Sequence, residues 1–322
     1  MKVCVTGGSG FIGSNFIHYF LDKNKDSQIL NYDKLTYAGN PANLDGIDNT
    51  RYQFVQGDIC DYSFFKEALH KFKPEIVIAF AAESHVDRSI TSPQEFLQTN
   101  VLGTESVLRV IRDLQIKKLI HISTDECYGS LESPLQATEE SKFDPNSPYS
   151  VSKAAGDMLC HAYYVTYGVP VVVIRGSNCF GPRQHPEKFI PKSIVNLIKD
   201  NPIGIYGGGT NVREWIFTED FCKGVEVVSS KGKLGEAYNL GGGYHNRYTN
   251  NVVAENLCQI FNKSMDSHIK YIPDRLGHDK RYALDSNKLE KLGWRSNYTL
   301  KEGLIKTVDW YQKNETWWKS LI

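Results

Sequence analysis

A glycine-rich turn close to the start of the chain constrains its fold most. Residues 2–6 are apolar enough for a buried strand, and 14–23 have the pattern of an amphipathic helix. Between them stands Gly7-Gly8-Ser9-Gly10-Phe11-Ile12-Gly13, with the spacing G-x-x-G-x-x-G. Such glycines permit a tight turn and close approach of the backbone to a ligand, and the helix N-terminus attracts an anion. The pattern predicts the phosphate-binding turn of a dinucleotide-binding domain; the plainer alternative is an ordinary strand-to-helix turn.

Strands and helices alternate along the first half of the chain. Further buried strands are expected at 28–32, 51–56, 75–80, 118–123 and 169–175. This alternation is typical of α/β proteins and predicts a doubly wound, Rossmann-type parallel sheet of six or seven strands. The rhythm breaks near residue 177, where Pro and Gly become dense. We therefore expect a dinucleotide-binding domain over 1–176 and a smaller, mainly substrate-binding C-terminal lobe over 177–322, with segments at about 210–250 returning to the first domain.

The acid at the end of the second strand indicates which dinucleotide is bound. Asp33 stands 20 residues after Gly13, where a carboxylate accepts hydrogen bonds from the adenine ribose. Since a carboxylate there repels a 2′-phosphate, the residue favours NAD over NADP, although the neighbouring cation Lys34 complicates this prediction. Asp58 is expected either to border the adenine end of the cofactor or to cap the helix 62–72, and it can do both.

A polar cluster is expected where the fifth strand ends. Thr124, Asp125 and Glu126 follow an apolar run, and Tyr149 and Lys153 stand four residues apart at the start of a helical pattern. Side chains at this spacing share one helix face. Because strand ends and helix starts of a doubly wound fold border one crevice, we predict that these five residues carry the chemistry.

Tyr149 and Lys153 suit proton transfer from a hydroxyl group. Tyrosine has a reference pKa of about 10 and is a poor base near neutrality, but a neighbouring cation stabilises the phenolate. We expect Lys153 to lower the pKa of Tyr149 in this way and to bond the nicotinamide ribose, with Thr124 as a hydroxyl donor. Tyr149 then takes the proton of a substrate hydroxyl while the hydride of that carbon passes to NAD. The predicted cofactor-binding residues are Gly7, Gly10, Phe11, Ile12, Gly13, Asp33, Lys34, Leu35, Thr36, Asp58, Ile59, Ala81, Ala82, Ser84, Thr99, Tyr149 and Lys153.

The neighbouring carboxyls Asp125 and Glu126 need an explanation of their own. Two acids at the end of a buried strand are costly unless they are used, and a simple dehydrogenase or epimerase does not need them. Once a sugar carbon is oxidised to a ketone, the neighbouring C–H becomes acidic. One carboxylate can remove that proton while the other, protonated, helps a hydroxyl leave as water. The plain alternative is a solvated acidic turn.

Several features of the remaining chain bear on a ligand or a partner. Lys188, Arg213 and Arg275 are candidate diphosphate ligands, because guanidinium forks match phosphate oxygens; solvated surface cations are the alternative. Arg275 and His278 lie in a loop that precedes an expected strand at 281–284.

The buried and interfacial parts of the chain are also predicted from the pattern. A single histidine without an evident partner favours a structural role for His85. The segment 96–114 reads as a helix that is apolar on more than one side, typical of burial or of a subunit interface. The polar segment 129–147 is predicted to be a lid beside the site, and the aromatic tail 300–322 to be a docked C-terminal helix.

Composition excludes several classes of function. Lys and Arg number 37 and Asp and Glu also 37, so the zero net charge does not indicate nucleic acid or an acidic membrane. The seven Cys contain no C-x-x-C pair, which predicts reduced thiols and neither disulfides nor a metal site. A chain that starts directly with a strand and has no apolar run of about 20 residues is expected to be cytoplasmic, without signal peptide or membrane span.

These motifs together resemble a known family. The chain is similar to the extended short-chain dehydrogenase/reductases (NAD-dependent epimerase/dehydratases) and, within them, to the dTDP-glucose 4,6-dehydratases, along nearly its full length. The resemblance rests on the glycine-rich turn, on the Thr-Asp-Glu triplet and Tyr-x-x-x-Lys, and on the segments 33–40, 81–89, 186–191 and 275–279. The triplet and the segment 186–191 are the motifs most particular to the dehydratases.

The resemblance implies a lyase reaction and a role for each residue. Tyr149 would deprotonate the glucose 4-hydroxyl, oriented by Thr124, and hydride would pass from C4 to NAD. Glu126 would remove the C5 proton, and Asp125 would protonate the departing 6-hydroxyl. Hydride would then return to C6, which leaves NAD unchanged and yields a nucleotide 4-keto-6-deoxyglucose, a precursor of rhamnose and other deoxysugars. A homodimer is implied as well.

The family also implies a set of substrate contacts. Thymidine or uridine diphosphate would be held in the second lobe. The predicted substrate-binding residues are Ser84, Thr124, Asn178, Lys188, Phe189, Ile190, Pro191, Tyr206, Arg213, Asn246, Arg275 and His278.

Several positions depart from the usual pattern of the family without removing a catalytic group. Cys127 stands where Val is usual, Cys179-Phe180 replaces Asn-Tyr, Gly204 takes a common Pro position, and the residues around Asn246 differ. The alternatives are a UDP-glucose 4,6-dehydratase, a nucleotide-sugar epimerase or a decarboxylase and, in another class, a catalytically silent NAD-binding sensor. An epimerase needs neither acid of the triplet, a decarboxylase needs a cation near C6, and a silent sensor would have lost catalytic groups that are present here.

Overall fold

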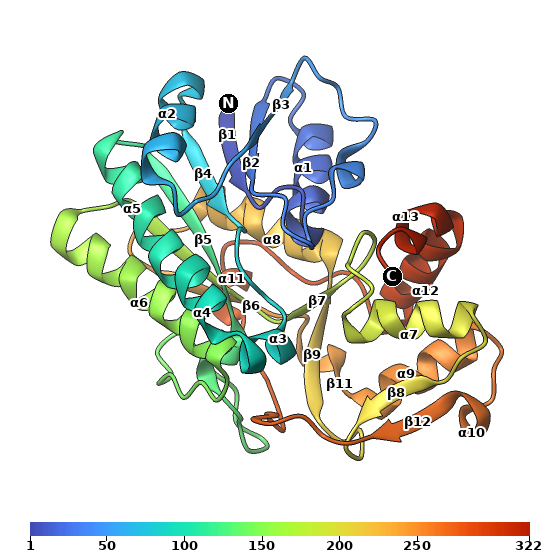
Figure 1. Cartoon of the computed structure of the whole chain (residues 1–322). Helices are drawn as coiled ribbons and strands as arrows, with labels where there is room; N and C mark the ends of the chain where they lie inside the picture. Colours follow the sequence, from blue (N-terminus) through green and yellow to red (C-terminus); the bar gives the residue numbers. More distant parts are fainter.

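A computed structural model describes the whole chain, residues 1–322, and its centre is a seven-stranded parallel sheet. The strand order β10-β6-β5-β4-β1-β2-β3 reverses direction of winding beside β1, as a doubly wound fold requires (Figure 1). The α/β, Rossmann-type prediction is therefore confirmed. In sheet order the strands are β10 (Ala237–Leu240), β6 (Val171–Gly176), β5 (Lys118–Thr124), β4 (Ile76–Ala79), β1 (Lys2–Thr6), β2 (Gln28–Asp33) and β3 (Tyr52–Gln56).

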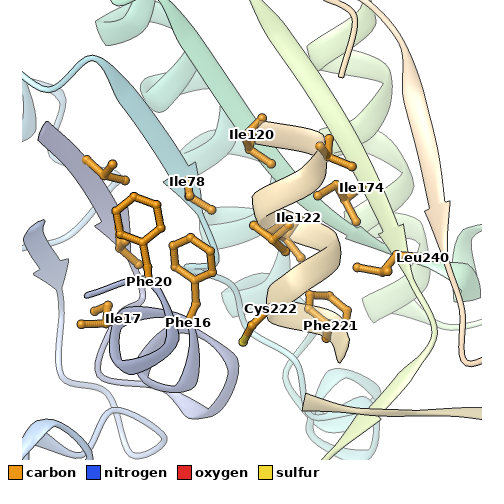
Figure 2. Packing of buried hydrophobic residues seen from close by; sticks show 14 of the residues in the cluster. Phe16, Ile17, Phe20, Ile78, Ile120, Ile122, Ile174, Phe221, Cys222 and Leu240 are labelled. Atoms are coloured by element: carbon orange, nitrogen blue, oxygen red, sulfur yellow. The ribbon is translucent and has the colours of Figure 1, made fainter. Parts of the chain in front are cut away.

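Helices cover both faces of this sheet. On one face α1 (Phe11–Lys23) and α8 (Thr218–Lys231) bury Phe16, Phe20 and Phe221 against the isoleucines of the central strands, as Figure 2 shows. On the other face lie α2 (Tyr62–Phe72), α5 (Gly103–Asp113) and α6 (Pro148–Tyr167). The strands between them are apolar on both faces, which is why they read as continuous apolar runs in the sequence.

Local sequence explains where α6 begins and ends. Ser147 and Ser150 form a reciprocal capping box, Pro148 occupies the first turn, and Gly168 ends the helix in a left-handed conformation with φ of 69°. These signals place Tyr149 and Lys153 in the first two turns, at the end of the helix that borders the cleft.

The predicted helix over 96–114 forms, with a π-helical segment inside it. It consists of α4 (Pro93–Phe96), the π-helical segment η2 (Leu97–Leu102) and α5, which follow one another without a gap. Within η2, the side chain of Asn100 both accepts from Glu83 N at 2.9 Å and donates to Glu83 O at 3.0 Å. A side chain committed to a neighbouring loop accounts for a bulge at this point, since π-bulges occur where helical pairing is interrupted. α5 buries one side only, and so it is not apolar all round.

A second lobe forms beside the carboxyl ends of the sheet. It contains the parallel pair β8–β12, the sheet β11-β9-β7 and several helices around one core, which includes Trp215, Tyr311 and Trp318. Its elements are β7 (Asn178–Phe180), α7 (Phe189–Ile198), β8 (Ile203–Tyr206), β9 (Val212–Phe217), β11 (Arg247–Thr249), α9 (Asn250–Ile260), α10 (Met265–His268), β12 (Ile269–Ile272), α12 (Leu300–Lys313) and α13 (Glu315–Lys319). The expected C-terminal helix is thus two helices that part at Asn314.

Two segments after residue 177 join the first sheet: α8 packs beside α1, and β10 extends the sheet next to β6. The predicted strand at 281–284 does not form. Arg281 bridges to Val212 and Leu284 bridges to Ala137, so the segment changes partner before it can extend along one strand.

The short elements complete the chain. They are η1 (Pro41–Leu44), α3 (Val86–Thr91), η3 (Asp125–Tyr128), η4 (Tyr244–Asn246) and α11 (Asn287–Glu290). None of the helices combines the length and the apolar character that crossing a bilayer demands.

Candidate active site

A cleft of about 320 Å³ lies where the carboxyl ends of the sheet strands face the second lobe. This is the crevice in which doubly wound folds bind ligands. All five predicted catalytic residues line it, and so do all the predicted cofactor residues except Leu35. The sequence therefore identified residues that come together in space, although it could not show how each is held.

Two positions of the glycine-rich turn, Gly7 and Gly13, have no room for a side chain. A Cβ on Gly7, whose φ is +71°, would lie 2.6 Å from Ala81 N, and a Cβ on Gly13 would lie 2.3 Å from Gly7 O. Side chains at these positions would clash with the backbone of the turn and of the chain after β4. The turn thus packs tightly behind the cleft and exposes backbone toward it.

Asp33 organises the adjacent wall. Its carboxylate accepts from Ser9 N at 2.9 Å and from Leu35 N at 2.8 Å. Burial raises the pKa of Asp33, and the two backbone hydrogen bonds oppose that rise. Each oxygen keeps a second lone pair for another donor, so the carboxylate can still accept from a ribose hydroxyl.

The cation beside Asp33 pairs with the acid that follows the next strand. Lys34 Nζ lies 2.8 Å from Asp58 Oδ2, and 59% of the lysine side chain is exposed. Asp58 is not the cap of the next helix, as one of its two predicted roles required. Asp61 caps α2 instead, since its side chain accepts from Phe64 N at 3.0 Å.

The chain of the Thr-Asp-Glu triplet turns out of β5 into η3. Thr124 Oγ1 donates to Asp125 Oδ1 at 3.2 Å and accepts from Glu126 N at 3.3 Å. Asp125 is 3% exposed, and its Oδ2 atom is buried without a partner. The backbone turn brings both acids to the cleft that Tyr149 also lines, so these acids are not a solvated turn.

The two acids are held in different electrostatic surroundings. Burial, then the charges of Glu126 and Glu214, raise the pKa of Asp125 well above its ordinary value. Burial also raises the pKa of Glu126, but the cations Arg275, Arg213 and Lys188 oppose it. Neighbouring carboxylates thus add to the effect of burial on the pKa of Asp125, whereas three cations oppose the effect of burial on the pKa of Glu126.

Tyr149 and Lys153 are both buried beside the end of β5, and burial shifts the pKa of each. Burial, followed by the charge of Glu126, raises the pKa of Tyr149 well above its ordinary value, and the hydroxyl of Thr124 opposes the rise. Lys153 donates from Nζ to the carbonyl of Ile122 at 2.6 Å, and burial lowers its own pKa. The Lys153 side chain therefore anchors the start of α6 to the end of β5.

Four of the predicted substrate residues line the cleft, namely Ser84, Thr124, Asn178 and Lys188. Lys188 Nζ donates to Ser84 O at 2.7 Å, which ties the second lobe to the chain after β4. Asn178 Oδ1 is buried without a partner and remains available to a ligand.

A second group of predicted substrate residues lies just beyond the cleft lining. Arg213 donates to Asp279 O at 2.8 Å, with its guanidinium 4.2 Å from the ring centre of Tyr282. Arg275 pairs with Asp87 at 3.6 Å and has a buried Nε without a partner. Both cations act electrostatically on Glu126. Tyr206 and His278 complete this group: Tyr206 OH donates to Asp87 Oδ2 at 3.0 Å, and His278 Nδ1 lies 2.6 Å from Asp274 Oδ1.

The other predicted substrate residues are occupied elsewhere. Ile190 and Pro191 are buried in α7, and Phe189 packs on the core of the second lobe. Asn246 is 1% exposed; its amide donates to Gly242 O and Tyr298 O, and its carbonyl accepts from Leu300 N. None of these four lines the cleft.

Sequence reasoning missed several residues of the lining, among them Glu83, Ser177, Gln184, His185 and Glu187. Ser177 Oγ and Gln184 Oε1 are buried without partners. The density of Gly and Pro after residue 177 was the only signal that this stretch bends around a site. His85, expected to be a structural histidine, lies 3.5 Å from Glu187 Oε2.

The lining fits a dinucleotide. The tight glycine turn suits a phosphate, and Asp33 can accept from a ribose hydroxyl. Among the unpartnered atoms, the Ser177 hydroxyl can donate or accept, and the amide oxygens of Asn178 and Gln184 can accept from donors of a ligand. No cluster of side chains suited to a metal ion occurs in the structure.

The fold and the site define the class of the protein: an extended short-chain dehydrogenase/reductase with Tyr-x-x-x-Lys on a helix beside a dinucleotide turn. The sequence model of the GDP-mannose 4,6 dehydratase family matches residues 4–307. The chain belongs to this family of nucleotide-sugar 4,6-dehydratases.

Individual relatives agree with this assignment. The chain is 43% identical to a dTDP-glucose 4,6-dehydratase of Haemophilus influenzae, over 98% of this chain and 99% of the relative. Among solved structures, it resembles the dTDP-glucose 4,6-dehydratase of Bacillus anthracis in complex with NAD (TM-score 0.93, 43% identity, 100% of both chains). It also resembles that of Streptomyces venezuelae with NAD bound (TM-score 0.95, 42% identity, 100% of both chains).

Proposed function

We propose that this protein is a dTDP-glucose 4,6-dehydratase. It is a hydro-lyase that converts dTDP-glucose to dTDP-4-keto-6-deoxyglucose, an early step toward rhamnose-type deoxysugars. The observation that carries the proposal is the meeting of Asp125, Glu126 and Tyr149 in one cleft beside the dinucleotide turn. The full-length similarity to dTDP-glucose 4,6-dehydratases supports the choice of substrate.

The first proton is taken at the sugar 4-hydroxyl. NAD, when bound, would accept the hydride from C4 and return it to C6 after water has left, and it would place a positive charge beside the phenol. Thr124 hydrogen-bonds and orients the 4-hydroxyl, and Tyr149 accepts its proton as the C4–O bond becomes a carbonyl. Lys153, anchored on the Ile122 carbonyl, holds the start of α6 against β5 and contributes its charge to the same pocket.

Water is then lost through the two acids. Glu126 removes the C5 proton, which the C4 carbonyl has made acidic, and Asp125 gives its proton to the 6-hydroxyl as the C6–O bond breaks. Glu126 afterwards returns a proton to C5. The raised pKa of Asp125 and the three cations around Glu126 support this division of roles, since one acid must begin protonated and the other ionised.

The nucleoside diphosphate is bound by the cations of the second lobe. Lys188, Arg213 and Arg275 supply three positive charges near Glu126, and guanidinium forks suit diphosphate oxygens. Their positions support binding of the diphosphate between the sugar site and the second lobe.

We also infer that the protein is a homodimer. Val151, Met158 and Val165 stand seven residues apart on α6 and are 46%, 63% and 67% exposed, which gives the helix one apolar stripe on its outer side. Leu97 and Leu102 on the neighbouring η2 are 48% and 55% exposed. Exposed apolar patches of this kind mark protein interfaces, and a helix pair of this type suits a two-fold dimer.

The cellular location proposed is the cytoplasm. All seven cysteines are free, and five of them are buried. Unpaired thiols in a chain of this size suit a reducing compartment, where nucleotide sugars would be the available substrates.

The test of the function is product analysis on three nucleotide sugars. The protein, supplied with NAD, should convert dTDP-glucose to a product that has lost the mass of one water and carries a 4-keto group and a 6-methyl group by NMR. UDP-glucose and GDP-mannose, run beside it, should react at least tenfold more slowly. Faster reaction of either would reassign the substrate, and a product of unchanged mass would indicate an epimerase.

A further inference from the structure

Three segments far apart in the sequence meet at the edge of the cleft. They are the loop after β2 that contains Tyr37, the start of α3 with Arg88, and the turn before α7 that contains Glu187. Thr36 and Ala38, on either side of Tyr37, line one wall of the cleft, and Glu187 lines the other. A contact between Tyr37 and Glu187 therefore joins the two walls.

Tyr37 is held on three sides. Its hydroxyl donates to Glu187 Oε1 at 3.1 Å, between residues 150 positions apart. The guanidinium carbon of Arg88 lies 4.0 Å from the centre of its ring. The ring of His185 meets it edge-on, with centroids 5.6 Å apart. A side chain that is 37% exposed would otherwise move freely at the surface, so these contacts fix a loop that has few other ties to the second lobe.

Glu187 continues the bridge to the opposite side. Its other oxygen, Oε2, lies 3.5 Å from His85 Nε2, and its side chain is only 15% exposed. The next residue, Lys188, donates to Ser84 O at 2.7 Å. The chain after β2 is thus connected through one carboxylate to the chain after β4.

We propose that Tyr37 and Glu187 form a latch across the cleft that slows the release of the bound dinucleotide. The latch rests on the proposed function, because it presumes that NAD occupies this cleft. The walls that it joins carry Asp33 and Thr36 on one side and Gln184 on the other, so a ligand seated between them leaves by this route only when the hydrogen bond opens. A cofactor that is restored in each turnover has no need to leave, and slow release suits it.

The latch is tested by the rate at which NAD dissociates. Wild type and Tyr37→Phe are loaded with radiolabelled NAD, chased with excess unlabelled NAD, and filtered at intervals. Tyr37→Phe keeps the ring and its contacts with Arg88 and loses only the hydroxyl, so release should be about tenfold faster, as expected for loss of a hydrogen bond to a carboxylate. Tyr298→Phe is the matched control: Tyr298 OH donates to Glu219 Oε2 at 2.9 Å, and neither residue lines the cleft.

A second variant shows whether the two residues act together. As a single change, Glu187→Gln should also speed the release of NAD. In the double variant with Tyr37→Phe, it should increase the release rate by a smaller factor, because the two changes remove the same contact. If wild type retains NAD and Tyr37→Phe releases it at the same rate as wild type, the latch is overturned and the proposed function is not. Wild type that takes up no NAD overturns the proposed function, and the latch with it.

Discussion

At the scale of single residues, the buried acid Asp125 lies in surroundings that disfavour its charged form. Its Oδ2 has no partner, and the charges of Glu126 and Glu214 are near enough to raise its pKa further after burial has done so. An environment that keeps a carboxyl protonated serves a proton donor, and it stores unfavourable energy whenever the group ionises.

Asp125→Asn should therefore stabilise the protein while it abolishes loss of water. The pKa of Asp125 is raised in the folded state, so this residue contributes fully to the free energy of unfolding at pH values below its unfolded-state pKa. That contribution is lost as the pH rises through its folded-state pKa. The amide does not titrate. The variant should gain about 0.5–2 kcal/mol in free energy of unfolding, measured with urea.

The gain should be larger at pH 8 than at pH 5, since only wild type loses stability over that interval. A matched Asp285→Asn variant, at a site away from the cleft lining, controls for the loss of one carboxylate elsewhere in the chain. Equal stability of wild type and Asp125→Asn at both pH values would mean that Asp125 is not held protonated.

At the scale of elements, one buried ion pair fixes the helix that carries Tyr149 and Lys153. Arg175 on β6 donates from Nε to Asp157 Oδ2 at 2.7 Å and from Nη2 to Oδ1 at 3.0 Å, and Asp157 lies on α6. Arg175 also donates to Tyr128 OH and to the carbonyl of Glu139, each at 2.8 Å. The pair thus joins the sheet, the catalytic helix and the segment 129–147.

Removal of one partner should be far more harmful than removal of both. Arg175→Met leaves a buried carboxylate without its cation and should lower the free energy of unfolding by about 3–5 kcal/mol. The double variant Arg175→Met/Asp157→Leu should recover most of that loss, because no charge is left unpaired. Urea unfolding of both variants decides the matter, and a single variant as stable as the double one would show that the pair contributes little.

The helices and strands show which parts of the fold can be predicted from sequence patterns. The strands around Val5 and Ile120 could be predicted, because apolar runs and βα alternation depend on local sequence. The π-helical segment around Asn100 could not, because the contacts of Asn100 with Glu83 are not visible in the local sequence. The failed strand after Arg281 has the same cause: its partners are chosen by tertiary structure.

The candidate site shows the same division between local and distant information. Motifs located the glycine turn, the triplet and the Tyr-x-x-x-Lys pair, because each is a short segment at an element boundary. The raised pKa of Tyr149 could not be predicted, because the spacing of Lys153 reveals neither the burial of the phenol nor the charge of Glu126 near it. The partner of Tyr37 lies 150 positions away and left no sequence signal.

At the scale of the whole molecule, the proposed dimer depends on the apolar stripe of α6. Met158→Glu places a charge in the middle of that stripe and should shift the protein from dimer to monomer, because an unpaired buried charge is costly at an interface. Light scattering coupled to size exclusion reports the mass directly. Ile305→Glu is the control, since Ile305 is 48% exposed on α12 of the second lobe. A Met158→Glu variant that stays dimeric would place the interface elsewhere.

The central claim is that Glu126 takes the C5 proton after the sugar has been oxidised at C4. The most direct measurement is the absorbance spectrum of Glu126→Gln mixed with dTDP-glucose. The account predicts that reduced nicotinamide accumulates to nearly one equivalent per site while turnover falls by a factor of about 10²–10⁴, since oxidation proceeds and elimination does not. Turnover at the wild-type rate, with no reduced nicotinamide, would contradict it.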